Sequence, residues 1–213
     1  MVLNFRLLFV FTSVFFTLEN NLQKNYFEGI ISYSVEALDK SKKMTKDESI
    51  QYIGDKQIYF IKENKYKTVM NGLLKITQFY TGKDTLYNTM QGSNALVYIS
   101  VLKQNERVIS FDIKKNQSTI LGLKCDVLSI KTNDSSMKYY FNKDIKVNKE
   151  LYKNHKTGLW YFCLNKTDGA LPLKWVTDST DSKLTIEAEK IDLKKLNDSI
   201  FKTPKNLPLV KSQ

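Results

Sequence analysis

Residues 27–35 read Phe27-Glu28-Gly29-Ile30-Ile31-Ser32-Tyr33-Ser34-Val35. The apolar side chains of Phe27, Ile31, Tyr33 and Val35 fall on one face of an extended chain, and the opposite face is mainly polar. Alternation of this kind is typical of a half-buried β-strand. The stretch therefore predicts a strand of a sheet that buries one of its faces.

Similar short segments follow along the chain, separated by turn residues. Asn71-Gly72 is the strongest short-range hairpin signal, and residues 148–155 form the best helical candidate. About a dozen strands at nearly regular spacing are typical of an all-β barrel or sandwich. The further strands expected are 51–53, 57–61, 66–70, 73–80, 85–89, 95–101, 108–113, 118–130, 137–141, 158–164, 171–176 and 184–188.

The first residues have the features of a leader. Residues 1–19 place a basic residue, Arg6, before an apolar core of roughly 10 residues, which predicts a secretory signal peptide. The alternatives are a buried first strand and a short membrane anchor. Residues 20–213 are then expected to form a single β-rich domain with a short polar tail from about residue 203. The expected location is periplasmic or secreted, in the cell envelope, with a soluble chain once the signal peptide is removed.

The chain is basic, with a formal net charge of +11. The surplus is almost entirely lysine, because Arg6 and Arg107 are the only arginines. Recognition of bases and phosphates favours the planar fork of arginine, so specific nucleic-acid binding is not expected. A lysine-rich surface attracts anionic headgroups, which predicts peripheral membrane contact. The alternative explanation is a lysine- and asparagine-rich genomic composition.

Residues that usually carry chemistry are few. His155 is the only histidine, and its polar neighbours predict an exposed position. A zinc site needs three or four ligands at close spacings, which His155, Cys125 and Cys163 do not offer. A Cys–His nucleophile pair is disfavoured because both cysteines fall in strands expected to be buried. We therefore expect no enzyme activity, no metal and no cofactor.

The two cysteines leave two alternatives open. Cys125 and Cys163 are an even number in a compartment that permits oxidation. A disulfide between them would stabilise the fold by roughly 4 kcal/mol in the chain-entropy model. The other interpretation is two buried thiols that act as small hydrophobic side chains.

A sheet of this kind buries one face, and barrels that do not fill themselves with side chains leave a ligand cavity. The alternative is an ordinary packed core. The side chains expected to line the cavity are Phe27, Ile31, Tyr33, Phe60, Ile76, Tyr80, Ile109, Phe111, Leu121, Leu123, Trp175 and Ile186.

Several short motifs carry a family resemblance. Ile120-Leu121-Gly122-Leu123-Lys124-Cys125 matches a pattern "I-x-G-x-K-C", and Asp198-Ser199-Ile200-Phe201-Lys202-Thr203-Pro204 matches a closing "D-x-x-F-x-x-P". Residues 26–33, 52–56 and 138–145 continue the pattern. In these motifs the chain resembles a family of secreted or periplasmic envelope proteins of Bacteroidota, which are similar in strand order to the lipoprotein carriers LolA and LolB.

The resemblance implies an open, incomplete antiparallel β-barrel of about 10–12 strands with one or two short helices. It also implies a non-catalytic envelope protein that binds a hydrophobic or amphiphilic ligand, a lipid or a lipoprotein acyl chain, in the concave face. Lysines at the rim are expected to meet an anionic headgroup. The alternative is a structural or interaction module that docks an envelope protein partner through a strand edge or a basic surface.

Overall fold

The computed structural model describes residues 26–212, so the leader expected at 1–19 lies outside the described residues. Twelve strands form one sheet in the order β12-β6-β5-β4-β3-β2-β1-β11-β10-β9-β8-β7. Their bounds are β1 Gly29–Asp39, β2 Lys56–Lys62, β3 Lys65–Met70, β4 Thr77–Tyr80, β5 Thr85–Thr89, β6 Leu96–Ser100, β7 Val108–Ile120, β8 Leu123–Thr132, β9 Ser135–Lys146, β10 Ala170–Ser179, β11 Ser182–Leu193 and β12 Leu209–Lys211.

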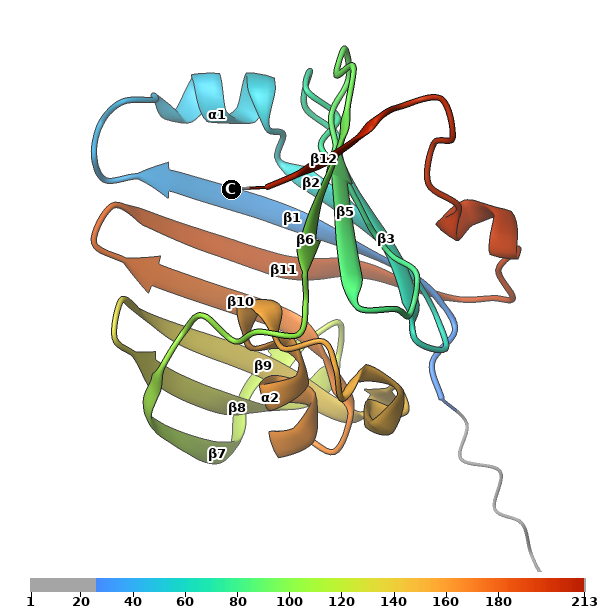
Figure 1. Ribbon diagram of the computed structural model, residues 1–213. Coiled ribbons are helices and arrows are strands. Elements are labelled where there is room, and N and C mark those ends of the chain that lie inside the picture. The colour runs from blue at the N-terminus through green and yellow to red at the C-terminus, as the bar shows by residue number, and fades with distance from the viewer. Residues whose placement is uncertain (1–25, 213) are drawn as a thin grey trace, which may run out of the picture.

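The sheet is open. Neighbouring strands are antiparallel except for β12, which pairs parallel with β6. In the part of the chain that the structure describes, β12 and β7 end the strand order and do not pair with each other. Figure 1 shows the sheet curving strongly, with the α2 helix (Trp160–Lys166) lying in front of β8–β10. The expected mainly-β class and open antiparallel sheet with short helices are confirmed.

Strand β1 lies at the centre of the sheet and has the predicted alternation, with Ile31, Tyr33 and Val35 buried. Its register with β2 places Ile31 opposite Tyr59 and Ile30 opposite Phe60. Side chains that face each other across two strands lie on the same side of a sheet. Tyr59 therefore points inward, and Phe60, expected in the cavity, lies on the outer side, where it is half-buried.

Residues 51–53 are not a strand. The α1 helix covers Lys46–Tyr52 and begins with a capping box, in which Thr45 Oγ1 accepts from Glu48 N at 3.2 Å and Glu48 Oε2 accepts from Thr45 N at 2.7 Å. The spacing Thr45-x-x-Glu48 is a helix-start signal in the sequence. It satisfies free backbone donors of the first turn, which favours the helix over the expected strand.

The β3–β4 hairpin is present, but its loop is longer than a two-residue turn at Asn71-Gly72 would give. Val69 pairs with Thr77, which leaves residues 70–76 to make the reversal. Asn71 Oδ1 accepts from Lys56 N at 2.9 Å, and Gly72 N donates to Ile53 O at 3.2 Å. These two residues dock the loop against the α1–β2 connection instead of forming the turn by themselves.

The expected single strand 118–130 is two strands. Ile120 pairs with Leu123, and Leu121 and Gly122 between them have φ of 50° and 77°. Two successive positive φ values make a tight turn whose twist matches that of the flanking strands. Leucine rarely takes this conformation, so a turn at Leu121 is hard to predict from the sequence. Leu121 lies exposed at the tip of the turn.

The segment between β9 and β10 is helical. It contains the 3₁₀ helices η1 (Lys149–Tyr152) and η2 (Thr157–Leu159) and the α2 helix, so the strand expected at 158–164 is wrong and the helix expected at 148–155 is one short turn. A short apolar run does not distinguish a buried strand from a buried helix. Here Cys163 and Leu164 of α2 are buried, and so is Leu159 just before the helix.

Gly169 closes this segment where it rejoins the sheet. Its φ is +84°, and a Cβ there would lie 2.2 Å from Val147 O. Val147 N also donates to Gly169 O at 2.9 Å. The two ends of the helical segment thus meet backbone to backbone, which leaves no room for a side chain.

Gly169→Ala is expected to destabilise the protein much more than Gly122→Ala. Gly122 has a similar φ of +77° but open space around it, so it isolates the cost of the left-handed conformation, about 1–2 kcal/mol. Gly169→Ala adds the clash with the Val147 carbonyl, and we expect a loss at least about 2 kcal/mol larger. Urea unfolding of the two variants measures this, and equal losses would contradict the close approach.

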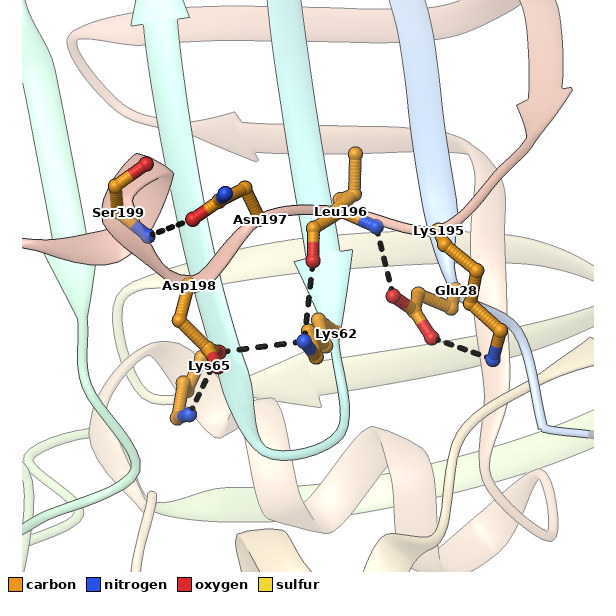
Figure 2. Close-up of polar contacts among 8 residues, drawn as sticks. All are labelled: Glu28, Lys62, Lys65, Lys195, Leu196, Asn197, Asp198 and Ser199. Carbon is orange, nitrogen blue, oxygen red and sulfur yellow. Dashed lines mark hydrogen bonds and ion pairs between the residues drawn. The ribbon is translucent and has the colours of Figure 1, made fainter.

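After β11 the chain crosses the outside of β1–β3 and is held there by charged side chains (Figure 2). Glu28 accepts from Leu196 N at 2.8 Å and from Lys195 Nζ at 2.9 Å. Asp198 pairs with Lys65 at 3.1 Å and Lys62 at 3.4 Å. These two ammonium groups lower the pKa of the Asp198 carboxyl. These contacts hold residues 195–198 against the sheet, and the chain then continues through η3 (Asp198–Phe201) to β12.

Candidate ligand-binding cavity

The interior of the curved sheet is divided into two core clusters. One contains Tyr33, Tyr59, Tyr66 and Leu86 among its buried residues. The other joins β8, β9 and α2 and contains Tyr139, Leu159 and Cys163. Domains of this size usually have one contiguous core. The side chains of the concave side therefore pack as two separate groups.

A cavity of about 380 Å³ lies between the two clusters. Its walls come from β2–β5 on one side, from β9 and β10 on the other, and from residues 155–163. Because β5 and β9 are far apart in the strand order, their side chains can share a cavity only on the concave face. The lining residues are Gln57, Tyr59, Tyr66, Thr68, Gln78, Leu86, Glu106, Ser135, Met137, Tyr139, His155, Thr157, Gly158, Leu159, Trp160, Cys163, Trp175 and Thr177.

Aromatic rings form a continuous band along this cavity. The Trp160 ring lies 6.1 Å from Tyr59 and 5.9 Å from Tyr66, between ring centroids. Trp175 lies 5.8 Å from Tyr33, which in turn contacts Tyr59 at 6.3 Å. Aromatic side chains bury large apolar areas in preferred tilted and edge-on geometries. The band gives the cavity a rigid apolar wall.

Several of the polar lining groups lie towards one end of the cavity. Gln57, Thr68 and Gln78 come from neighbouring strands, and Ser135 and Thr177 lie towards the same edge of the opposite wall. Glu106 is the one charged side chain among the described residues that line the cavity, and no lysine lines it. The expected lysine rim for an anionic headgroup is therefore absent from the described lining.

His155 is not exposed as expected. It is 2% exposed, and its Nε2 lies 2.7 Å from the hydroxyl of Tyr66. Its ring stacks on Tyr66 at 5.7 Å and meets Tyr80 edge-on at 4.5 Å. Burial lowers the pKa of His155 to about 4, so the ring is neutral at neutral pH. Polar neighbours in sequence misled the prediction because His155 turns inward between two short helices.

His155 and Cys163 both line the cavity, but they do not form a catalytic pair. His155 Nε2 is bonded to Tyr66, and its Nδ1 has no hydrogen-bond partner among the described residues. Burial raises the pKa of the Cys163 thiol to about 12. A nucleophilic cysteine needs a lowered pKa. The arrangement therefore favours binding over nucleophilic chemistry.

Both cysteines are free and buried in the structure. They belong to different clusters, Cys125 to that of β1 and Cys163 to that of α2. Cys163 also lies in a helix, not in the strand predicted from the sequence. Of the two open alternatives, the structure has the buried thiols.

We expect neither thiol to react with Ellman's reagent in the native protein, and both to react after unfolding in denaturant without reductant. The reason is that both side chains are buried and both thiol pKa values are raised by burial. The protein should be isolated from an oxidising compartment, because a disulfide between the two cysteines could form there. Two thiols missing after unfolding would indicate a disulfide.

The structure distributes the sequence-predicted cavity residues over several environments. Phe27, Ile31, Tyr33, Tyr80 and Ile186 are buried in the first core cluster. Ile76 and Leu123 are half-buried against the same cluster. Trp175 is the member of the prediction that lines the cavity.

Three of the predicted cavity residues are exposed. Ile109 and Phe111 lie on the end strand β7 with exposed fractions of 59% and 45%, and Leu121 lies on the following turn. Strand β7 is an end strand of the sheet, so these side chains are only partly covered. Phe111 is in contact with α2 through Phe162, at 5.5 Å between ring centroids.

The sequence prediction missed Tyr59, Tyr66, Tyr139 and Trp160. The sequence pattern placed Phe60 in the cavity and not its neighbour Tyr59. Which of these two successive residues faces inward is decided by the register of β2 with β1. Tyr66 lies opposite Ile61 and Tyr80 in the ladder, so the same inward face continues through β3. The position of Trp160 in the cavity wall requires residues 160–166 to form a helix, and no side chain caps the start of this helix.

Two further features bear on the kind of site. Among the described residues no cluster of histidine, cysteine and acidic side chains could hold a metal ion. Within residues 26–212 no helix has the length and apolar composition needed to cross a bilayer.

An open, mainly antiparallel sheet with a cavity on its concave face is the class of structure that these observations define. No protein-family model matches the sequence, and the curated proteins contain no match. Among solved structures, the chain is similar to PNGF-II, with 13% identity, a TM-score of 0.45 and 86% of this chain covered; it spans 31% of the PNGF-II chain.

Two further similar structures cover most of both chains. A LolA superfamily protein from Nitrosomonas europaea has 8% identity and a TM-score of 0.39, covering 83% of this chain and 90% of its own. The lipoprotein LppX from Mycobacterium tuberculosis has 8% identity and a TM-score of 0.37, covering 80% and 89%.

Proposed function

We propose that this chain is a non-catalytic binding protein that holds a hydrophobic or amphiphilic ligand, a lipid or a lipoprotein acyl chain, in its concave-face cavity. The observation that carries the proposal is the space of about 380 Å³ left between two core clusters. Protein interiors are normally close-packed. Cavities of a few hundred cubic ångströms with mainly apolar walls and a few polar groups are typical of small-molecule sites.

The walls suit an apolar tail. Tyr59, Tyr139, Trp160 and Met137 line the cavity and present rings and a thioether to its space. Burying apolar surface stabilises a complex by about 25 cal/mol per Å², so an alkyl chain gains about 0.8 kcal/mol for each methylene placed there. Preformed aromatic walls lose little conformational freedom when a ligand binds.

Export to the cell envelope is part of the same proposal. It rests on the leader expected at residues 1–19 and on the family resemblance of the motifs around Cys125 and Asp198. We also infer that residues 20–213 act as one domain, because a single sheet contains every strand described. The lysines outside the cavity are available for peripheral contact with an anionic membrane surface.

Mass spectrometry of an organic extract tests the proposal. Protein purified without detergent from its native source is expected to release a stoichiometric apolar species. Met137→Trp fills the cavity and is expected to abolish that species, whereas Leu38→Trp adds the same bulk at an exposed position of β1 and keeps it. An extract of the unaltered protein with no such species would contradict ligand binding.

A second candidate function is favoured by the β7 edge. In the described part of the chain no strand pairs with the outer side of this strand of 13 residues, and Ile109, Phe111 and Ile113 are exposed along it. A long free edge with apolar side chains is a template for adding a strand from another chain. The β7 edge therefore suits docking of an envelope protein partner.

The two functions respond to different substitutions. Ile113→Lys places a charge on the free edge and is expected to weaken docking of a partner while the apolar extract stays unchanged. Met137→Trp is expected to have the opposite pattern. Crosslinking of intact envelopes reports the first effect and extraction reports the second. Loss of crosslinks in the cavity variant alone would exclude the edge as the docking site.

A further inference from the structure

Four buried polar atoms have no hydrogen-bond partner among the described residues: Gln57 Oε1, Glu106 Oε2, His155 Nδ1 and Trp160 Nε1. All four residues line the concave-face cavity. Buried polar groups are almost always paired, and each exception calls for an explanation. Their restriction to the walls of one cavity indicates that a ligand supplies the missing partners.

The deepest of the four is part of a rigid arrangement. His155 is 2% exposed, and its ring is fixed by the bond from Nε2 to the Tyr66 hydroxyl and by the edge-on contact with Tyr80. Its Nδ1 is therefore held in one direction, and the His155 ring lies 6.2 Å from the Trp160 ring between centroids. Leaving such a buried group unpaired is unfavourable, because it has lost its hydrogen bonds to water.

The chemistry of the four atoms limits the group that can pair with them. The indole Nε1 of Trp160 only donates, and Gln57 Oε1 and Glu106 Oε2 only accept. A carboxylate or phosphate headgroup has no donor for the two acceptors, and Glu106 repels it. An ammonium group has no acceptor for Trp160. A hydroxyl group both donates and accepts, and it suits either tautomer of His155.

We propose that the ligand carries an uncharged headgroup with several hydroxyl groups, as in a monoacylglycerol or an alkyl glycoside. This inference rests on the proposed function and specifies the polar part of its ligand. The apolar tail lies along the aromatic band, and the hydroxyl groups pair with Gln57, Glu106, His155 and Trp160. The absence of lysine from the described lining fits an uncharged headgroup.

Intrinsic fluorescence reports on this cavity directly, because Trp160 and Trp175 are the only tryptophans of the chain and both line it. The probes are dodecyl compounds below their micelle concentrations: monolauroylglycerol, dodecyl maltoside, laurate and dodecyltrimethylammonium. Glycerol and maltose serve as headgroups without a tail. The two hydroxylated amphiphiles are expected to bind at least about tenfold more tightly than laurate and dodecyltrimethylammonium.

Each other outcome has a distinct meaning. Laurate or dodecyltrimethylammonium binding as tightly as the hydroxylated probes would overturn the headgroup inference and leave the proposed function standing. If maltose alone binds as tightly as dodecyl maltoside, the recognition of hydroxyl groups stands. The proposal that the cavity binds an apolar tail is then contradicted. No change with any probe would overturn both.

Substitutions at Glu106 give the matched test. Glu106 lies in the loop before β7, so its replacement is not expected to disturb the sheet. Glu106→Leu removes the acceptor and is expected to weaken dodecyl maltoside about tenfold, whereas Glu106→Gln keeps an acceptor oxygen and most of the affinity. Glu36→Leu, exposed on β1, is the control with no effect. A loss in Glu106→Gln as large as in Glu106→Leu, or no loss in either, would contradict the assignment.

Discussion

Tyr152→Ala is expected to lower the free energy of unfolding by about 3–5 kcal/mol. Tyr152 is fully buried, and its ring lies 6.0 Å from Tyr80 and 6.3 Å from Trp160. Its hydroxyl donates to Glu63 O, 3.0 Å away in the β2–β3 turn. The side chain thus fixes the helical segment 147–169 to the opposite half of the sheet. Urea unfolding at neutral pH measures the loss.

Two further variants separate the causes. Tyr152→Phe removes only the hydroxyl and is expected to cost about 1 kcal/mol. Tyr52→Ala, at an exposed tyrosine of α1, is expected to change stability by less than about 0.5 kcal/mol. A loss in Tyr152→Ala no larger than in Tyr52→Ala would show that the segment is not anchored by this ring.

Acidification is expected to remove about 3 kcal/mol of stability through His155 alone, between about pH 7 and pH 4. Burial lowers the pKa of this ring from 6.5 to about 4 in the folded chain. The unfolded chain therefore takes up the proton first as the pH falls. The stability is fully present above the unfolded pKa of 6.5 and is lost as the pH approaches the folded value near 4.

Two measurements isolate this effect. The proton resonances of the single histidine are expected to titrate with a midpoint near 4. The free energy of unfolding is also measured against pH for the protein and for His155→Gln. The difference between the two curves reports His155, because both chains have the same carboxylates. A midpoint at or above 6.5 would mean that His155 is solvated and does not line a dry cavity wall.

The predictable part of this fold is the local alternation. The buried face of β1 could be assigned from the sequence because Ile31, Tyr33 and Val35 repeat with the period of a strand. The predicted strand boundaries were wrong where a short turn interrupts an apolar run. At Leu121, the positive φ is imposed by the two-residue turn between β7 and β8.

The cavity was harder to predict because it is a property of pairing between distant strands. The inward position of Tyr59, in place of Phe60, follows from the register of β2 with β1. Tyr66 and Tyr139 line the same cavity because the whole sheet is curved. His155 and Trp160 enter the site through a helical segment that an apolar run does not distinguish from a strand.

The structure also changes the expected ligand. The sequence suggested lysines meeting an anionic headgroup, since the chain carries a net charge of +11. Charge averaged over a surface does not describe a cavity, and the described lining has Glu106 as its charged residue. The buried atoms without partners are better guides to the headgroup, because their cost is relieved only by a matching group.

A crystal structure of the protein with dodecyl maltoside bound would decide whether the concave face holds a ligand. We expect the dodecyl chain along the aromatic band, between Trp160 and Trp175. We also expect sugar hydroxyls within hydrogen-bond distance of Gln57 Oε1, Glu106 Oε2, His155 Nδ1 and Trp160 Nε1. Detergent bound only at the β7 edge or the outer face, with the concave side closed by its own side chains, would contradict ligand binding in the cavity.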